Sequence, residues 1–516
     1  MSVNVLIFTD CGSKIFMRYA GAYKIASVLR EAGYSVQVVD HFLLSGPETI
    51  TKIIDKFVGE DTLMVCWSTT FMNITDEHSV MAARTPEMFQ FQNLKKIVLG
   101  ASTVLGFADG IPIVPDEFQN IITHIKGINP GTRLVLGGTK ADLQAQQGID
   151  AFVVGYGDVA IVEYAKFLEG KNPFFQFKKL NDTQISIEND VKASTYNFVE
   201  SQITFAESDF IRPGEVLPIE ISRGCMFKCK FCYYPLIGRK KNDYTKTEEV
   251  LYAELMRNYE DFGTTNYMLS DDTFNESVSK LEFFANLVNR LPFKIEYCTY
   301  LRLDLIHRFP EMADLLKESG LKVAMFGLET LNHEAGKAIG KGLHPELSKQ
   351  TLTWLRETKG WKNNILMSSG FIIGLPFDTP ETVNAWASEL VSFKYPLDTF
   401  NFHALRLNPT DVKIWKSEFE KNYAEYGYHF DKNKSEGWIN EHWQFEDARD
   451  LAVELHNYAL HAGLSPVNGF FAMMLRNYNY SWDDIRLFGW PRFVHEHLFQ
   501  QTKVQADAYF DKVLAL

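Results

Sequence analysis

The chain has 516 residues, a formal net charge of −13, 46% hydrophobic residues and 23% charged residues. This length exceeds what one hydrophobic core usually serves and predicts two or three domains. The composition, with 14% aromatic residues, excludes an intrinsically disordered chain. The acidic charge disfavours nucleic acid as a partner, because it would repel a phosphate backbone. We interpret the basic run Arg239-Lys240-Lys241 as a solvated loop and keep it only as a candidate substrate contact.

The N-terminal apolar stretch is too short to span a membrane and lacks the features of a signal peptide. Elsewhere, no run of about 18 apolar residues occurs. The chain has six cysteines, and three of them are crowded together, which is unlike a secreted disulfide framework. We therefore expect a cytoplasmic protein without a membrane partner.

Residues 1–170 alternate short apolar runs with helical patterns. A helix with apolar positions from Ala22 to Leu29 is expected to end near Gly33, which can take the left-handed conformation of a C-terminal cap. Such runs are typical of a doubly wound, Rossmann-like parallel sheet that is buried on both faces. The predicted strands are Val5–Phe8, Val36–Val39, Leu63–Trp67, Leu134–Leu136 and Phe152–Val154.

The loops after these strands, at 9–14, 67–72, 137–141 and 155–158, should meet at the carboxyl edge of the sheet, where doubly wound folds bind ligands. Their glycines suit a backbone that a ligand approaches closely, or they simply turn the chain. No dinucleotide-binding or P-loop motif is present. The segment 73–115 is an insertion that the sequence pattern does not assign.

Residues 171–214 are expected to form a connector that includes a strand-like piece at 184–187. Over 215–410 strands again alternate with helices, at 216–220, 267–269, 295–297, 323–326 and 371–373, which predicts a complete or partial barrel of parallel strands. A capping box at 245–248 should open one of the helices, and Gly263 should end it. Residues 411–516 are predicted to be helical, for example over 446–461, without further strands.

Three cysteines, Cys225, Cys229 and Cys232, follow the first strand of this second domain within eight residues. Thiolates are the ligands that iron-sulfur clusters take, and three of them would leave one iron open to another molecule. A structural zinc site, completed by Cys298, or a group of unrelated buried cysteines are the alternatives. Zinc usually needs four ligands in two pairs, and no second pair is present. We expect Cys11, Cys66 and Cys298 to lie outside the cluster.

The spacing C-x-x-x-C-x-x-C, with aromatic Phe231 before the last cysteine, resembles the signature of the radical S-adenosylmethionine (SAM) superfamily. The resemblance implies a 4Fe-4S cluster whose unique iron is chelated by SAM. It further implies reductive cleavage of SAM to a 5'-deoxyadenosyl radical, with electrons from a donor such as flavodoxin or ferredoxin.

Three more elements resemble this family in order and spacing. The stretch 269–274 is similar to its "DD-T-F" element, which holds the methionine amino group, and 327–330 with 341–342 is similar to its "G-E-S…K-G" element. The stretch 370–376 is similar to the strand that borders adenine. The residues that the resemblance places around SAM are Phe231, Ser270, Asp271, Asp272, Glu329, Ile373 and Gly374.

A doubly wound domain before such a barrel resembles the cobalamin-binding half of cobalamin-dependent radical enzymes, whose "G-G-x" and "V-x-G-E-G-E" stretches are similar to 137–139 and 153–158. Tyr156 and Asp158 depart from the usual acidic residues. No D-x-H-x-x-G follows the first strand, so the first loop offers no histidine to cobalt. The candidate cobalamin-binding residues are Ser68, Thr69, Thr70, Gly137, Gly138, Thr139, Gly155, Tyr156 and Gly157.

The predicted architecture is thus α/β, with a cobalamin-binding-type domain at 1–170, a connector at 171–214, a partial radical SAM barrel at 215–410 and a helical region at 411–516. The expected activity is methylation of an unactivated carbon of a small molecule or peptide. A radical cyclisation or rearrangement without methyl transfer, and a non-catalytic corrinoid or cluster carrier, remain as alternatives. The candidate substrate-side residues are Tyr233, Tyr234, Tyr297 and Tyr300.

Overall fold

The computed structural model describes residues 2–10, 15–69, 116–138, 141, 147–188, 198–234, 236–240, 244–392, 395–407, 416–430, 437–462, 469–487 and 492–516. Most of the chain divides into two compact units. The N-terminal unit contains Met1–Arg212 and Glu496–Leu516, and the barrel unit contains Pro213–Thr410 and Trp415–His495. The predicted insertion at 73–115 and the candidate residues Cys11, Thr70 and Thr139 lie outside the described residues.

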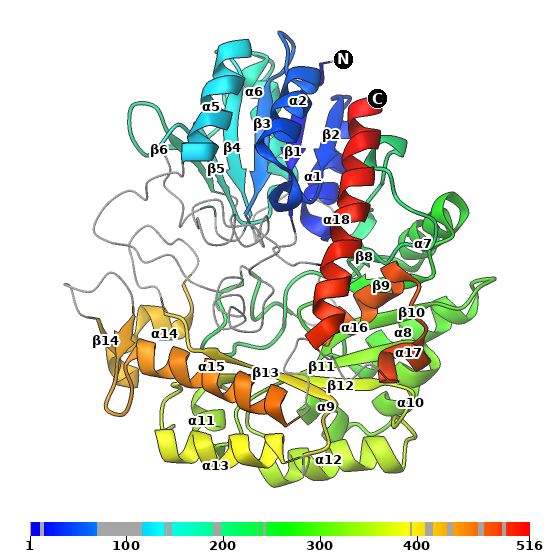
Figure 1. Cartoon of the computed structure of the whole chain (residues 1–516), viewed down its shortest axis with the longest axis vertical. Coiled ribbons are helices and arrows are strands. Elements are labelled where there is room, and N and C mark those ends of the chain that lie inside the picture. Colours follow the sequence, from blue (N-terminus) through cyan, green and yellow to red (C-terminus); the bar gives the residue numbers. More distant parts are fainter. Residues whose placement is uncertain are drawn as a thin grey trace. The chain divides into compact units, whose positions relative to one another are not determined.

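The N-terminal unit contains a seven-stranded sheet in the order β2-β1-β3-β4-β5-β7-β6 (Figure 1). Neighbouring strands are parallel, except that β6 runs antiparallel to β7. This confirms the doubly wound sheet that the apolar runs predicted. The strands are β1 (Val5–Phe8), β2 (Val36–Val39), β3 (Met64–Ser68), β4 (Arg133–Gly137), β5 (Ala151–Val154), β6 (Lys178–Lys179) and β7 (Ile185–Glu188).

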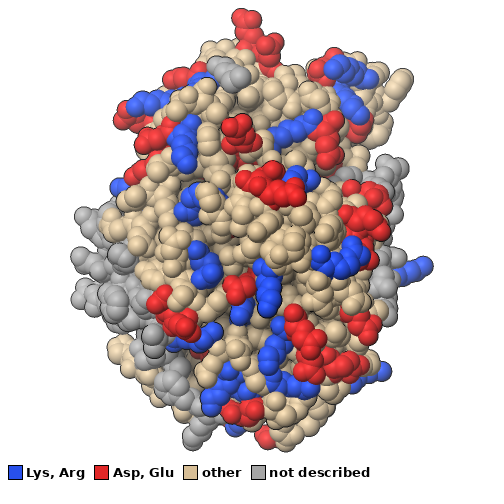
Figure 2. Space-filling model, turned by 90° about the vertical axis from the view of Figure 1, so that its right-hand side faces the viewer, with Lys and Arg blue, Asp and Glu red and all other residues tan. Residues whose placement is uncertain are grey.

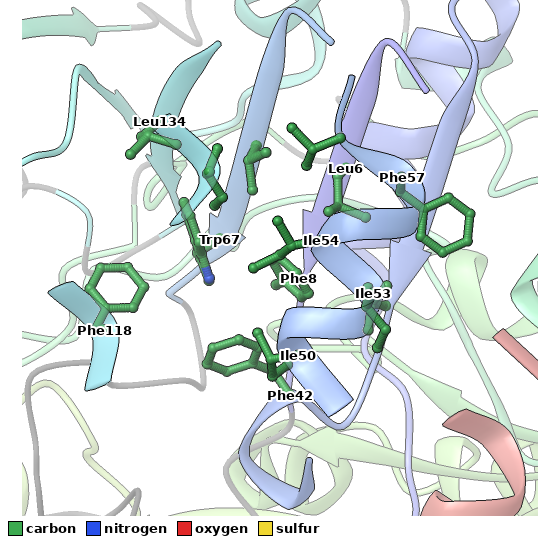
Figure 3. Packing of buried hydrophobic residues seen from close by; sticks show 14 of the residues in the cluster. Leu6, Phe8, Phe42, Ile50, Ile53, Ile54, Phe57, Trp67, Phe118 and Leu134 are labelled. Atoms are coloured by element: carbon green, nitrogen blue, oxygen red, sulfur yellow. The ribbon is translucent and has the colours of Figure 1, made fainter. Parts of the chain in front are cut away.

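Helices cover this sheet, and one core lies between the sheet and helices α2 and α5. Figure 3 shows side chains of α2 packed against those of β1 and β3. The core residues labelled there are Leu6, Phe8, Phe42, Ile50, Ile53, Ile54, Phe57, Trp67, Phe118 and Leu134. The helices of the unit are α1 (Ala20–Glu31), η1 (Phe42–Leu44), α2 (Pro47–Phe57), α5 (Asp116–Ile128), α6 (Asp158–Leu168), η5 (Phe198–Glu200) and η6 (Glu207–Asp209).

The C-terminal helix α18 (Arg492–Ala515) completes the same core with Ala506, Tyr509, Phe510 and Val513. The hydroxyl of Tyr509 accepts a hydrogen bond from the Asp40 amide at 3.0 Å and donates one to the Val38 carbonyl at 3.2 Å, at the end of strand β2. The helix lies beside β2 in Figure 1. The last residues of the chain therefore stabilise its first domain, which the sequence pattern did not indicate.

Part of the expected connector also belongs to the N-terminal unit. Strands β6 and β7 extend the sheet, and the residues after them pack along helix α1. There the Lys24 ammonium donates to the Gln202 carbonyl at 2.8 Å, and Arg30 forms a bidentate ion pair with buried Asp209 at 2.8 Å. These bonds hold Gln202 and Asp209 against helix α1, so this part of the expected connector packs within the N-terminal unit.

The barrel unit contains six parallel strands in strict sequence order, β13-β12-β11-β10-β9-β8. This confirms the predicted partial barrel and adds β13, which the sequence pattern missed. The strands are β8 (Leu217–Ile219), β9 (Asn266–Leu269), β10 (Glu296–Leu301), β11 (Leu321–Glu329), β12 (Leu366–Ile373) and β13 (Thr399–Ala404). The helices between them are α7 (Glu248–Phe262), α8 (Val278–Asn289), α9 (Leu303–Arg308), α10 (Met312–Glu318), α11 (His333–Ala338), α12 (Pro345–Glu357) and α13 (Pro380–Val391).

Helix α7 begins at Glu248, two residues later than expected from a capping box at 245–248 with Thr245 as the N-cap. Thr247 is its N-cap and accepts from the Val250 amide at 3.4 Å, whereas Thr245 forms a backbone bridge with Ser222. The prediction of the start was wrong because this tertiary bridge uses the first threonine. The predicted end is confirmed, since Gly263 adopts a φ of 63°.

The rest of the barrel unit is mainly helical, as predicted, but it also contains a short antiparallel pair of strands, β14 (His429–Phe430) and β15 (Trp438–Ile439). Two-residue strands are too short to leave a periodic signal in the sequence. The helices are α14 (Glu418–Lys421), η7 (Tyr423–Tyr426), α15 (Phe445–His461), α16 (Phe470–Met474), η8 (Leu475–Tyr478) and α17 (Trp482–Leu487).

Two surface properties of the described residues bear on partners. No helix among them is long and apolar enough to cross a membrane. On the face shown in Figure 2, basic and acidic side chains are interspersed.

Candidate active site

The three cysteines lie on a loop that follows β8 and folds back on itself. Gly224, with a φ of 74°, makes the turn, and a β-carbon there would come within 2.5 Å of the Leu236 carbonyl oxygen. The Cys225 amide donates to that oxygen at 3.1 Å, and the Cys232 amide donates to the Cys229 carbonyl at 3.0 Å. These backbone bonds give the loop a defined path while all three thiols stay partly exposed.

The thiols also interact electrostatically with one another, which places them in one neighbourhood. Burial raises the pKa of Cys225, and burial raises the pKa of Cys232 to about 12; the nearby Asp272 carboxylate and the Cys229 thiol add to both effects. A metal ligand must be the thiolate, so iron bound here would have to supply the positive charge that ionises these groups.

Three thiols in one loop are the donor type that an iron-sulfur cluster takes, whereas structural zinc usually takes four ligands. Within the described ranges, no group of three His, Cys, Asp or Glu side chains is arranged to hold a single metal ion. Cys66 and Cys298 are fully buried in β3 and β10, where burial raises the pKa of each thiol. Cys298 contacts the Tyr267 carbonyl, so its place does not complete a zinc site.

Asp271 holds the start of the cysteine loop rather than lying open to a ligand. One oxygen accepts from the Ile221 and Ser222 amides at 2.9 and 3.1 Å, and the other accepts from the Ser222 hydroxyl at 2.8 Å and the Lys280 ammonium at 2.6 Å. The side chain has no exposed area. Because both oxygens are occupied, we interpret Asp271 as a residue that ties the end of β8 to the end of β9.

Arg239 is part of the same buried network. Its guanidinium contacts both carboxylate oxygens of Glu276 at 2.8 Å, and the two side chains are 2% and 0% exposed. The idea that Arg239 lies in a solvated loop or contacts substrate is therefore wrong, because a buried guanidinium needs this carboxylate partner. Lys240 is exposed, and Lys241 lies outside the described residues.

Asp272 and Ser270 are the more accessible members of the same strand end. Burial, followed by the neighbouring Asp271 carboxylate, raises the pKa of Asp272 to about 6. Thr273 lies beside the cysteines, with its hydroxyl 3.3 Å from the Cys225 sulfur. Asp272 rather than Asp271 is thus the acidic side chain placed with the thiols.

Glu329 ends strand β11 in a strained conformation, with a φ of 68° after a register irregularity between Phe326 and Glu329. Its carboxylate lies 3.7 Å from the Lys341 ammonium, which also donates to the Gly327 carbonyl at 2.9 Å. Burial raises the pKa of Glu329, and Lys341 counteracts this rise. The structure therefore brings Glu329 and Lys341, from the two parts of the "G-E-S…K-G" element, together as an ion pair.

The end of β12 is clamped by the aromatic segment that follows the barrel. Gly374 has a φ of 89°, and Trp438 packs against its α-carbon. The Tyr428 hydroxyl donates to the Gly374 carbonyl at 2.8 Å, and the Trp443 indole donates to the Asp378 carbonyl at 2.8 Å. Ile373 is fully buried at the end of the same strand, so its side chain serves packing.

The aromatic candidates separate by burial. Tyr297 is fully buried and hydrogen-bonded to Ser319 at 2.8 Å, which makes it a packing residue. Tyr300 is 41% exposed, and Tyr233 and Tyr234 stack with ring centroids 5.8 Å apart. Phe231, before the last cysteine, is partly buried.

Arg302 was missed by sequence reasoning. It lies between β10 and α9, at the carboxyl end of a barrel strand, and its guanidinium contacts the sulfur of Cys229. A lone arginine after a predicted strand is the one local signal that the sequence carries for it.

In the N-terminal unit, the described candidates gather at the ends of three adjacent strands. Thr69 is buried, and both its amide and its hydroxyl donate to the Gly137 carbonyl, at 2.7 and 3.0 Å. Gly138 and Gly155 have φ of 112° and 90°, and a β-carbon on Gly137 would meet nothing closer than Val153 at 3.9 Å. Among the described residues of this edge, Ser68, Tyr156 and Gly157 are partly exposed.

Residues 219–390 match the family described as the radical SAM superfamily. The hopanoid C-2 methylase of Rhodopseudomonas palustris is 30% identical over 188 residues, which are 36% of this chain and 34% of that protein. The bacteriochlorophyllide d C-12(1)-methyltransferase of Chlorobaculum tepidum is 22% identical over 233 residues, which are 45% of this chain and 47% of that protein. The chain thus spans less than half the length of these curated relatives.

Two solved structures share the fold. The structure of TsrM from Kitasatospora setae, with cobalamin and a [4Fe-4S] cluster bound, matches with a TM-score of 0.59 at 15% identity. The match covers 98% of this chain and 100% of the TsrM chain. The structure of OxsB, with aqua-cobalamin and SAM bound, matches with a TM-score of 0.53 at 13% identity. The match covers 82% of this chain and 56% of the OxsB chain. A doubly wound domain with a partial parallel barrel is therefore the architecture of this chain. Residues 219–390, within the barrel unit, carry the match to the radical SAM superfamily.

Proposed function

We propose that this protein is a cobalamin-dependent radical SAM enzyme that methylates an unactivated carbon of a small molecule or peptide. The observation that carries the proposal is the loop of three neighbouring thiols at the carboxyl end of β8, in a chain that also contains a doubly wound domain. The similarity to two methyltransferases and to the fold of TsrM supports it.

In this proposal Cys225, Cys229 and Cys232 hold the cluster, and Asp272, Glu329 and the backbone at Gly374 surround SAM. The bound groups would supply reductive cleavage of SAM and delivery of a methyl group. The chain's own contribution is placement: the Asp271 network fixes the cysteine loop, the Glu329–Lys341 pair fixes the end of β11, and the aromatic clamp shapes the end of β12.

Cobalamin is assigned to the strand ends at Ser68, Gly137, Gly138 and Gly155. Gly138 and Gly155 have positive φ angles, and a β-carbon on Gly137 would make only ordinary contacts with Val153, so these described glycines carry no side chain that would hold a planar ring away. Since the sequence of the first loop contains no histidine, we propose base-off cobalamin without an imidazole ligand from that loop. Electrons would come from a flavodoxin or a ferredoxin.

Anaerobic reconstitution with iron, sulfide and hydroxocobalamin tests the proposal. We expect a visible cluster spectrum, retained base-off corrinoid, and, with SAM and a strong reductant, 5'-deoxyadenosine together with methylcobalamin. The matched control is the triple alanine variant of the three cysteines, which should retain corrinoid but form no 5'-deoxyadenosine.

Other outcomes discriminate the alternatives. A cluster and 5'-deoxyadenosine without retained corrinoid would indicate radical chemistry without methyl transfer. Corrinoid or cluster without any cleavage of SAM would indicate a carrier and refute the enzymatic proposal.

A further inference from the structure

The backbone of Arg302 is held rigidly at the mouth of the barrel. Asn275, in the loop after β9, donates to the Arg302 carbonyl at 2.9 Å and accepts from the Arg302 amide at 2.8 Å. Both residues are buried. This reciprocal pair fixes the direction in which the arginine side chain leaves the chain.

The guanidinium is fixed as firmly as the backbone. Its Nε and Nη2 atoms donate to the two carboxylate oxygens of Asp304 at 3.0 and 2.8 Å, which is the bidentate geometry that orients an arginine plane. The remaining nitrogen, Nη1, donates to the sulfur of Cys229 at 3.5 Å. An N–H group of a cation is thus aimed at one of the three thiols.

The same guanidinium packs on the cysteine loop through an aromatic ring. Its central carbon lies 4.0 Å from the ring centroid of Phe227, two residues before Cys229. The Arg302 side chain is 7% exposed, so water screens these contacts little. Arg302 therefore contacts both the Phe227 ring and the Cys229 sulfur of the cysteine loop, although it lies 73 residues after Cys229 in the sequence.

A hydrogen bond from a cation to a ligating sulfur favours the more negative, reduced state of a cluster, so it raises the reduction potential. Asp304 offsets part of the cation's charge but also holds the Nη1 group in place. The local geometry thus has an electronic consequence beyond packing.

We propose that Arg302 is a positioning residue that holds the Cys229 end of the cysteine loop and raises the reduction potential of the cluster bound there. The inference rests on the proposed function, since it requires the three thiols to hold a cluster. It goes further because it assigns the tuning of the cluster's reduction potential to a residue outside the cysteine loop and outside the three other elements that resemble the family.

Two variants separate tuning from packing. Arg302→Met keeps the length of the side chain and the contact with Phe227 but has no hydrogen-bond donor. Arg302→Lys keeps the positive charge but loses the planar guanidinium that binds Asp304 through two nitrogens. Arg356→Met is the matched control, because Arg356 also pairs with an aspartate, Asp398 at 2.7 Å, on another part of the barrel unit.

The measurement is a redox titration of the reconstituted protein, followed by electron paramagnetic resonance of the reduced cluster, with iron content determined in parallel. We expect a clear shift to more negative potential in Arg302→Met, a smaller shift in Arg302→Lys and none in Arg356→Met. Unchanged potential in Arg302→Met with full iron content would overturn the inference.

If Arg302→Met folds but holds no iron, Arg302→Lys decides, because it keeps a cation but loses the planar group that donates to the Cys229 sulfur. A negative shift in that variant supports the inference, and an unchanged potential refutes it. Absence of a cluster from the wild-type protein would instead refute the proposed function, so the two failures are distinguishable.

Discussion

Replacing Gly374 by alanine tests the clamp at the end of β12. The glycine adopts a φ of 89°, and an added β-carbon would lie 2.7 Å from Cζ2 of Trp438 and closer still to Cη2. Trp438 has little room to move, because it is 1% exposed and its indole donates to the Leu405 carbonyl at 2.7 Å. The variant must therefore strain both its backbone and its neighbour.

The magnitude follows from these two contributions. The left-handed conformation costs a non-glycine residue roughly 1–2 kcal/mol, and overpacking a well-packed core costs roughly 1–3 kcal/mol. We expect Gly374→Ala to lower the free energy of unfolding of the barrel unit by about 2–5 kcal/mol. Gly427→Ala is the matched control, since Gly427 has a φ of 81° and nothing lies within 4 Å of an added β-carbon. It should show only the backbone cost.

Urea denaturation of the purified variants provides the assay, with the barrel transition compared between proteins. Gly374→Ala is also made in a Trp438→Phe variant, because the smaller ring lacks the outer atoms that the new methyl group meets. The cost of Gly374→Ala should fall there by about 1 kcal/mol or more, which is a coupling energy typical of residues in contact. Equal costs for Gly374→Ala and Gly427→Ala, or no coupling to Trp438, would refute the clamp.

Three further predictions follow from single contacts. Cys229→Ala should abolish the visible absorption of the reconstituted cluster, whereas Cys298→Ala should retain it; the reverse result would show that the ligands are misassigned. Burial raises the pKa of Asp378 to about 7, above its unfolded value, so stability should be fullest at low pH and fall as pH rises from about 4 through 7. Asp378→Asn should remove this decline in denaturation midpoints measured from pH 5 to 8, and parallel curves for the two proteins would contradict the assignment. Tyr509→Phe should destabilise the N-terminal unit by roughly 1–3 kcal/mol, because it removes the hydroxyl that accepts a hydrogen bond from the buried Asp40 amide, and an unchanged unfolding transition would exclude this role.

Local patterns in the sequence predicted most strands of both sheets and the resemblance to the radical SAM superfamily, but they missed β6 and β13. Apolar runs such as Val5–Phe8 report burial on both faces of a parallel sheet, and the spacing of Cys225, Cys229 and Cys232 within one loop is itself the chemical signal. Such features are readable because they are carried by residues close together in the chain. Even so, Thr245 was mistaken for the cap of α7, since a tertiary bridge to Ser222 competes with local capping.

Only the tertiary structure decided which polar residues hold the site and which remain accessible. Asp271 and Asp272 are neighbours in sequence, yet one is fully bonded inside the protein and the other lies beside the thiols. Tyr509 completes the core of the first domain from the last helix, and Arg302 contacts a cysteine 73 residues away. These outcomes depend on which long-range partner satisfies each buried charge or hydroxyl, and no periodicity within a single segment carries that information.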